Sequence, residues 1–509
     1  MAAACSLPPG NGRLTHDHET CCYADRYRPQ WHFSPRRNWI NDPNGLIWLD
    51  GEYHLFYQYN PFGDLWGHMS WGHAVSSDLL HWTELEVAIP EDERVSIYSG
   101  SIVVDAANRS GLGAPGEKPL VAIYTGCRRV SEGGQSQEIA FSTDRGRTWT
   151  KYAGNPVLDI GLRDFRDPKV FWHASSARWV MAVVRPDDHQ VSFYGSANLR
   201  NWVHLSDFGP AGEAGGIWEC PDLIEFPSTD GGPSRWVLKV DTFAGHPGGT
   251  GAQVFIGDFD GTRFNLNGPA GSTGIWVDHG CDFYAALSWA NLPASHASPV
   301  WIGWMNNHGY AAKTPTAPWR GAMSVPRELF LRDTPEGVRM GQRPWPGLSA
   351  LRGEPTVCND LVLHDAARTI DTPWDDARSL ELVWDVTQTS AVEWGLHLRS
   401  GARAGLIVGI NRLTGNVFID RSDSGNTVDS VRWSGRREAP LPRTDDPMQL
   451  RILMDRCSVE VFAGEGMACL TELFFADDDH QELQVYARGG AVTHSALTVW
   501  PLRASMQHD

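Results

Sequence analysis

The 509-residue sequence has no long hydrophobic run, and no segment approaches the 18 or more apolar residues of a transmembrane helix. Basic residues are also few, with 43 Lys and Arg against 61 Asp and Glu, which gives a formal net charge of −18. A chain this acidic is a poor general binder of DNA, RNA or an anionic membrane surface. We therefore expect neither a nucleic-acid partner nor a membrane partner.

Cysteine is present, but not in a pattern that builds a scaffold. The nine cysteines are odd in number and no Cys-x-x-Cys pair occurs, so neither a zinc ribbon nor a disulfide framework is indicated. The first 22 residues have neither a basic n-region nor an apolar h-region, so they are not an intact signal peptide. We expect residues 1–30 to form a poorly structured leader.

Helical periodicity is missing too, and short strand patterns take its place. The 52 Gly and 32 Pro are high for a helical protein and normal for a turn-rich β protein. Short segments rich in β-branched and aromatic residues recur between Gly, Pro, Asn and Asp. Examples are 52–59, 119–125, 178–184, 235–240 and 300–305. These patterns predict an all-β chain.

A loose repeat of turn signals separates the strand patterns. In each copy a small or acidic residue starts a turn and an aromatic residue closes it. The closing residues are Trp82, Trp149, Trp202 and Phe264. Their spacings of 67, 53 and 62 residues fit a four-stranded blade with sizeable loops. With a further group of strands between 276 and 304, the repeat predicts a five-bladed β-propeller over residues 31–335.

The pattern changes near residue 335. Residues 336–355 are rich in Pro and Gly, which predicts a linker. Alternating strand patterns follow between residues 380 and 486, with turn signals at regular intervals. We therefore predict a C-terminal β-sandwich over residues 356–509.

Three carboxylates stand at the heads of predicted strands in different blades. Asp42 lies in the segment 41–45 (NDPNG), where the following proline biases it to an extended conformation. Asp167 follows Arg166, whose charge favours an ionised carboxylate. Glu219 stands between Trp and Cys, where an inward-facing carboxyl is poorly solvated and its pKa rises, as a general acid requires.

Each of these three segments also has an ordinary interpretation. Asp42 could lie in an exposed turn, Asp167 in a structural ion pair at a blade edge, and Glu219 on a surface loop. However, the inner strands of a propeller converge on one axis, so carboxylates far apart in sequence can meet in one pocket. Two carboxyl groups that flank a bond are the machinery of glycoside hydrolysis.

Three blocks, NWINDPNG (38–45), FRDP (165–168) and WECPD (218–222), resemble the signature blocks of glycoside hydrolase family 32, the invertases, inulinases and levanases. Further blocks resemble the family in the same order, at 51–74, 98–101, 282–285, 301–307, 318–328, 455–462 and 497–501. The resemblance covers roughly residues 31 to 503. It implies a five-bladed propeller followed by a β-sandwich, in agreement with the strand patterns.

The resemblance also implies a role for each carboxylate. Asp42 would be the nucleophile, Glu219 the general acid and then base, and Asp167 the residue that stabilises the transition state. The residues that match positions lining the fructose pocket are Asn41, Gln58, Trp66, Ser99, Arg166 and Trp304. Cys220 matches the cysteine beside the acid/base.

These roles predict a retaining β-fructofuranosidase that releases terminal fructose from sucrose, inulin or levan by double displacement. The two catalytic carboxyl groups are then expected about 5–5.5 Å apart. No metal and no organic cofactor is expected, because the acid, the nucleophile and the electrostatic stabiliser are all side chains.

Several alternatives stay open on the sequence alone. A fructosyltransferase or an endo-acting fructanase can use the same scaffold, although segment 60–71 resembles exo-acting inulinases and levanases. Segment 142–149 fits a sialidase box, but a sialidase needs an Arg cluster and a Tyr nucleophile that the sequence does not place. A non-catalytic sugar-binding protein is the remaining alternative, against which the three intact carboxylates argue. We expect a monomer that is extracellular or periplasmic, with the cytoplasm as the alternative compartment.

Overall fold

The computed structural model describes residues 25–506 apart from 130–132, 229–231, 268–273, 372–377, 401–402, 426, 443–447 and 477–480. Within these residues the regular structure is β-strand, apart from two short 3-10 helices, η1 (Ala311–Lys313) and η2 (Pro346–Leu351). None of the described helices has the length and apolar character needed to cross a membrane. The all-β prediction is confirmed.

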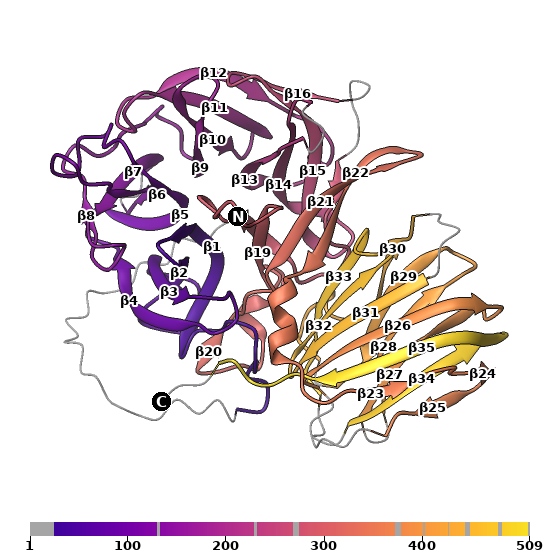
Figure 1. Ribbon diagram of the computed structural model, residues 1–509. Helices are drawn as coiled ribbons and strands as arrows, with labels where there is room; N and C mark the ends of the chain where they lie inside the picture. The colour runs from indigo at the N-terminus through magenta and orange to yellow at the C-terminus, as the bar shows by residue number, and fades with distance from the viewer. Residues whose placement is uncertain are drawn as a thin grey trace.

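The first part of the chain forms five sheets that follow one another around a common centre (Figure 1). The first sheet contains β1 (Asn38–Leu49), β2 (Glu52–Asn60), β3 (Ser70–Ser76), β4 (Thr83–Ile89) and β20 (Trp319–Arg320). The second contains β5 (Val95–Val104), β6 (Leu120–Arg128), β7 (Gln135–Ser142) and β8 (Thr150–Lys151). The third contains β9 (Arg166–His173), β10 (Arg178–Arg185), β11 (Gln190–Ser196) and β12 (Val203–Phe208).

The fourth sheet contains β13 (Trp218–Phe226), β14 (Arg235–His246), β15 (Gly249–Phe259), β16 (Phe264–Leu266) and β17 (Ile275–Trp276). The fifth contains β18 (Tyr284–Ser288), β19 (Val300–Trp304), β21 (Arg327–Thr334) and β22 (Gly337–Pro344). The innermost strands contact one another in the order β1, β5, β9, β13, β18, and β18 contacts β1. Buried apolar side chains fill the space between neighbouring sheets.

The predicted turn repeat joins the third and fourth strands of four sheets. In the first copy, the Asp78 carboxylate accepts hydrogen bonds from the backbone N–H groups of Leu80 and His81, both at 2.9 Å. Asp144, Asn198 and Asp260 accept equivalent bonds from residues two to four positions ahead. The side-chain oxygen therefore caps each turn, as the sequence pattern predicts.

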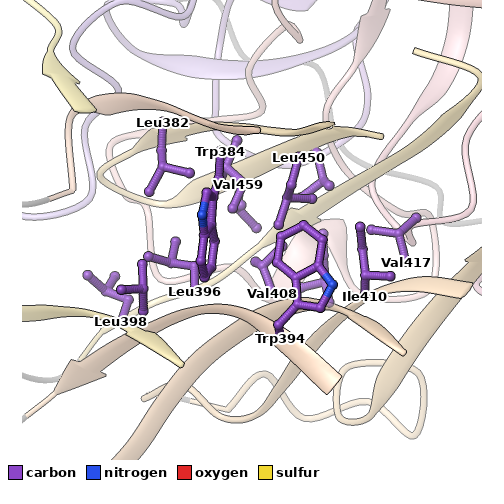
Figure 2. Close-up of a cluster of buried hydrophobic side chains, with 14 of the residues drawn as sticks. Leu382, Trp384, Trp394, Leu396, Leu398, Val408, Ile410, Val417, Leu450 and Val459 are labelled. Carbon is purple, nitrogen blue, oxygen red and sulfur yellow. The ribbon is translucent and has the colours of Figure 1, made fainter. Parts of the chain in front are cut away.

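The second part of the chain packs two sheets face to face. One sheet contains β23 (Thr356–Cys358), β24 (Leu363–His364), β26 (Leu380–Thr389), β31 (Met448–Asp455), β32 (Ser458–Ala463), β33 (Ala468–Leu473) and β35 (Ala491–Pro501). The other contains β25 (Ala367–Thr369), β27 (Glu393–Ser400), β28 (Arg403–Asn411), β29 (Asn416–Asp423), β30 (Arg436–Pro440) and β34 (Gln481–Arg488). Figure 2 shows their shared core, where Trp384 and Trp394 from opposite sheets meet edge to face at 4.9 Å.

Two boundary predictions need correction. The expected linker, 336–355, contains β22 and η2, because β22 pairs with β21 along its whole length. Gly337, Gly341 and Pro344 lie in β22, and Pro346 and Gly347 lie in η2, so most of its Pro and Gly residues belong to regular structure. In the expected leader, residues 1–24 lie outside the described residues, but residues 25–30 are folded, and Tyr27 and Arg28 are buried.

Buried ion pairs hold the two parts together. The His32 ring contacts Asp455 at 3.0 Å and Glu460 at 2.8 Å, and these hydrogen bonds raise the pKa of His32 although burial alone lowers it. Arg327 lies on the fifth sheet with its side chain fully buried and pairs with Asp278 at 3.0 Å and with Glu460 at 2.5 Å. The sandwich is therefore fixed against the fifth sheet.

Candidate active site

The three predicted carboxylates lie near the starts of innermost strands. Asp42 is on β1, Asp167 is the second residue of β9 and Glu219 is the second residue of β13. Ser99 on β5 and Tyr284 at the start of β18 add residues from the other two innermost strands. Five sheets thus deliver one group of polar side chains to the same end of their inner strands.

Each innermost strand breaks its pairing register at this end. The shifts fall between Ile40 and Pro43, Ile97 and Gly100, Arg166 and Lys169, Glu219 and Asp222, and Tyr284 and Leu287. A β-bulge re-aims the side chains beside it, and bulges are common next to active sites. Asp167 also has a φ of 64°, which is an unfavourable conformation for a residue with a Cβ. The local backbone is therefore shaped to direct these side chains toward the centre.

Two donors hold the Asp42 carboxylate. The Ser99 hydroxyl donates to Oδ2 at 2.5 Å, and the Asn41 amide donates to Oδ1 at 3.1 Å. The Asn41 oxygen in turn accepts the Trp39 indole N–H at 2.7 Å, which fixes the amide orientation. Both Asp42 oxygens therefore have defined directions.

Asp167 lies next to Asp42 across the Cys220 thiol. The sulfur is 3.6 Å from Asp42 Oδ2 and 3.6 Å from Asp167 Oδ2, so one side chain contacts both carboxylates. Asp167 also accepts the Cys220 backbone N–H at 2.9 Å. Burial raises the pKa of Asp167 to about 7, in spite of Arg166, and the charges of Glu219 and Asp42 add to this rise. Asp167 thus has its pKa in the neutral range.

Glu219 is the main partner of Arg166. The guanidinium is 3.0 Å from Glu219 Oε1 and 3.9 Å from Asp167 Oδ2, so the Arg that precedes Asp167 points chiefly at Glu219. The Tyr284 hydroxyl donates to Glu219 Oε2 at 2.7 Å. Burial raises the pKa of Glu219, but Arg166, His308 and the Tyr284 hydroxyl together bring it below its ordinary value. The expectation of a raised pKa for Glu219 is therefore wrong, because it omitted these three neighbours.

The remaining predicted site residues fall into two groups. Gln58 and Trp304 are buried, and neither the Gln58 Nε2 nor the Trp304 Nε1 has a hydrogen-bond partner among the described residues. Trp66 is 54% exposed and its ring meets Tyr98 edge to face. Buried donors without partners are uncommon in folded proteins and need an explanation.

The sequence matches two family descriptions along most of its length. "Glycosyl hydrolases family 32 N-terminal domain" matches residues 32–344, and "Glycosyl hydrolases family 32 C terminal" matches residues 348–501. The chain belongs to glycosyl hydrolase family 32. It is therefore a glycoside hydrolase by family.

Named relatives within family 32 cover nearly the whole chain. A levanase of Bacillus subtilis (strain 168) is 46% identical over 488 residues, which are 94% of this chain and 71% of the levanase. An extracellular exo-inulinase of Aspergillus awamori is 38% identical over 95% of this chain and 96% of that protein. The crystal structure of the A. awamori exo-inulinase superposes with a TM-score of 0.88 and covers 95% of this chain and all of that one, at 36% identity.

A solved enzyme–ligand complex is also similar to this chain. The β-fructofuranosidase of Schwanniomyces occidentalis, complexed with fructosyl-erythritol, has a TM-score of 0.84 and is 31% identical over 95% of this chain and 99% of that one.

Four further residues near the three carboxylates were given no role by the sequence analysis. Tyr284 lies in a block that resembles the family, but the sequence does not show which carboxylate its hydroxyl contacts. His308 packs against Phe243, Tyr284 and Trp304, and its Nε2 has no partner among the described residues. Lys239 and Asp241 are fully buried on β14. The sequence carries a signal for Lys239 and Asp241, because both are charged and they stand two positions apart in a mostly apolar strand. Alternate residues of a strand point to the same face, so the two side chains are expected to lie together.

A cavity of about 540 Å³ lies at the other ends of the innermost strands, opposite the β-bulges. Its lining includes Val103, Trp172 and Glu225 but none of the three carboxylates. A small cavity at the bulged end is bordered by Ser99, Asp167 and Cys220. The three carboxylates therefore lie at the bulged end, away from the cavity of about 540 Å³.

Proposed function

We propose that this family 32 glycoside hydrolase is a retaining β-fructofuranosidase that releases terminal fructose from sucrose and fructans. The observation that carries the proposal is the meeting of Asp42, Asp167 and Glu219 at one end of the inner strands, with the Cys220 thiol in contact with the first two. Hydrolysis with retention needs a nucleophilic carboxylate and a carboxylic acid that later acts as a base.

Asp42 is the nucleophile in this mechanism. Its carboxylate attacks the anomeric carbon of the fructosyl unit while the bond from that carbon to the leaving oxygen breaks. The donors Ser99 and Asn41 keep the carboxylate in one orientation, which favours attack from a fixed direction. The product of this step is a fructosyl ester of Asp42.

Glu219 is the acid in the first step and the base in the second. It gives its proton to the leaving oxygen, and then takes a proton from the water that attacks the ester and frees Asp42. Arg166 and Tyr284 hold both oxygens of Glu219. They favour the anion, so they assist the base step more than the acid step.

Asp167 stabilises the positive charge that develops on the sugar ring. As a buried neighbour of Asp42 it also accepts hydrogen bonds from fructose hydroxyls. Gln58, Trp304 and His308 supply buried donors for the remaining sugar oxygens. A sugar bound there supplies partners for donors that are otherwise unpaired.

The fold proposed for this function is a closed five-bladed propeller over residues 31–335 followed by a sandwich over 356–509. Its support is the sequence of contacts from β1 through β5, β9 and β13 to β18 and back to β1. Within that frame β22 belongs to the fifth blade, so the blade extends to residue 344.

Exo-action on fructans is supported by relatives and by the rim of the site. The relatives named above include a levanase and an exo-inulinase, the latter described as extracellular. On the loop after β2, Phe62 and Leu65 are exposed beside Trp66 and form an apolar edge suited to a sugar chain. We propose a secreted enzyme, and we propose that it acts as a monomer.

Product chromatography after incubation with sucrose, inulin and levan tests the proposal. Free fructose as the sole early product from the fructans supports exo-hydrolysis, and the Asp42→Asn and Glu219→Gln variants are expected to lose turnover while remaining folded. Oligosaccharides from inulin or levan would instead establish endo-cleavage, and longer oligosaccharides from concentrated sucrose would establish fructosyl transfer. An active Asp42→Asn variant refutes the assigned nucleophile.

A further inference from the structure

A fourth carboxyl group lies directly opposite the proposed acid/base. Asp241 on β14 pairs with Glu219 on β13 in the antiparallel register. Side chains of directly opposed residues point to the same face of a sheet, with Cβ atoms about 5 Å apart, and like charges there repel. Asp241 is fully buried. The Asp241 and Glu219 side chains therefore lie on the same face of the sheet, with Asp241 fully buried and the Glu219 side chain 16% exposed.

Asp241 has one cationic contact and one free oxygen. Its Oδ2 accepts a hydrogen bond from the Lys239 ammonium at 2.6 Å, and the same ammonium donates to the Cys220 carbonyl at 2.9 Å. Its Oδ1 has no hydrogen-bond partner among the described residues. This oxygen is available for a proton.

The charges around Asp241 and Glu219 differ. Burial raises the pKa of Asp241 to about 8 against the effect of Lys239, and the charges of Asp42 and Glu219 add to the rise. Glu219 instead faces Arg166 and the Tyr284 hydroxyl, with His308 and Asp167 also near it. These charges place the proton on Asp241, whereas acid catalysis needs it on Glu219.

We propose that Asp241 is a positioning residue that stores the catalytic proton and shares it with Glu219. One proton passes from the Asp241 carboxyl to the Glu219 carboxylate, and the negative charge passes the opposite way to Asp241, where the Lys239 ammonium holds it. Glu219 then gives that proton to the leaving oxygen. This inference rests on the proposed role of Glu219 as acid/base.

The pH dependence of Asp241→Asn tests the inference, because asparagine keeps the shape and removes the titrating group. A pair of interacting carboxyls loses its protons in two steps, and the last proton leaves at a higher pH than from one carboxyl alone. We expect the alkaline limb of kcat/KM for sucrose to move down by at least about one pH unit, which is about tenfold in activity on that limb. KM at the pH of maximal activity should stay within about twofold of the parent value.

Asp258→Asn is the matched control, since Asp258 lies on the adjacent strand β15 and is exposed. It replaces a carboxyl group by an amide in the same sheet and should leave the profile in place. An Asp241→Asn profile that superimposes on the parent, or that falls equally at every pH, overturns the inference. If Glu219→Gln is inactive and the Asp241→Asn profile is unshifted, only this inference is rejected. If Glu219→Gln is active, the acid/base assignment itself is rejected.

Infrared spectroscopy keeps the inference testable should Asp241→Asn fold poorly. The intact enzyme is titrated with acid and base while the C=O stretch of protonated carboxyl groups is followed. A buried carboxyl that stays protonated at neutral pH and ionises in the mildly alkaline range supports proton storage. Loss of every such band by pH 6 contradicts it.

Discussion

Replacing Tyr284 by Phe removes one hydroxyl from the proposed acid/base and leaves the ring in place. The hydroxyl donates to Glu219 Oε2 at 2.7 Å, and it lowers the pKa of Glu219 together with Arg166 and His308. A hydrogen bond to a charged group contributes about 1.5–3 kcal/mol. The bond favours the ionised form, so its loss favours the protonated form.

The expected result is an upward shift of the pH–activity profile. Since 1.36 kcal/mol corresponds to one pH unit, the alkaline limb of kcat/KM, which reports loss of the Glu219 proton, should move up by about one to two units. Glu219 is then protonated over a wider range, which helps the acid step, and is a base only at higher pH. The side chain of Glu219 is 16% exposed, so the lower part of this range is the better expectation.

The assay is the initial rate of fructose release from sucrose over a full pH series. Tyr124→Phe is the matched control, because the buried Tyr124 hydroxyl donates at 3.3 Å to Glu138, a carboxylate outside the site. Its profile should coincide with that of the parent enzyme. A Tyr284→Phe profile that stays in place, or that moves down, refutes the reasoning.

Three other changes probe the nucleophile, the rim and the junction between the two parts of the chain. Ser99→Ala removes a charge-assisted hydrogen bond of about 1.5–3 kcal/mol from Asp42, so kcat should fall by about 10- to 100-fold with little change in melting temperature; an unchanged kcat contradicts this. Trp66→Ala should raise KM for inulin and levan more than KM for sucrose, and equal effects on all three argue against a rim that binds the sugar chain. Arg327→Leu leaves two buried carboxylates without their partner and should lower the free energy of unfolding by about 3–5 kcal/mol in urea titrations, whereas a loss under 1 kcal/mol refutes the ion pair's role.

A fourth change concerns the pH dependence of stability at the same junction. His32 has its pKa raised by Asp455 and Glu460, so its contribution is fully present below pH 6.5 and is lost as the pH rises through the folded-state pKa. The free energy of unfolding should therefore decline as the pH rises. In urea unfolding measured over a pH series, His32→Gln should remove the part of this decline that His32 causes. A decline of the same size in the variant shows that other groups cause it.

Local motifs singled out the three carboxylates, and the structure brings them to the same end of the inner strands. The Asx turn repeat was equally local, and it predicted the hairpins around Asp78 and its three equivalents correctly. The turn between β21 and β22 was misread because Pro and Gly mark a tight hairpin and a linker alike. Composition alone does not separate these two structures.

Partners across the sheets were out of reach of the sequence. The Arg166–Glu219 pair joins residues 53 positions apart, and the Tyr284–Glu219 bond joins residues 65 positions apart. Both reverse the pKa direction that burial of Glu219 predicts. The cross-strand contact of Asp241 depends on the exact register of β13 and β14, which the strand patterns do not define. The placement of the three carboxylates at one end of the inner strands was therefore predictable, but their protonation was not.

Trapping of the covalent intermediate tests the central claim most directly. Parent enzyme is mixed with excess sucrose, quenched in acid within the first turnovers, digested and analysed by mass spectrometry. A retaining mechanism with Asp42 as nucleophile predicts one fructosyl unit on the peptide that contains Asp42, and none on that peptide in Asp42→Asn. Turnover without an adduct, together with a methyl fructoside of inverted configuration from reactions in methanol, would contradict the account.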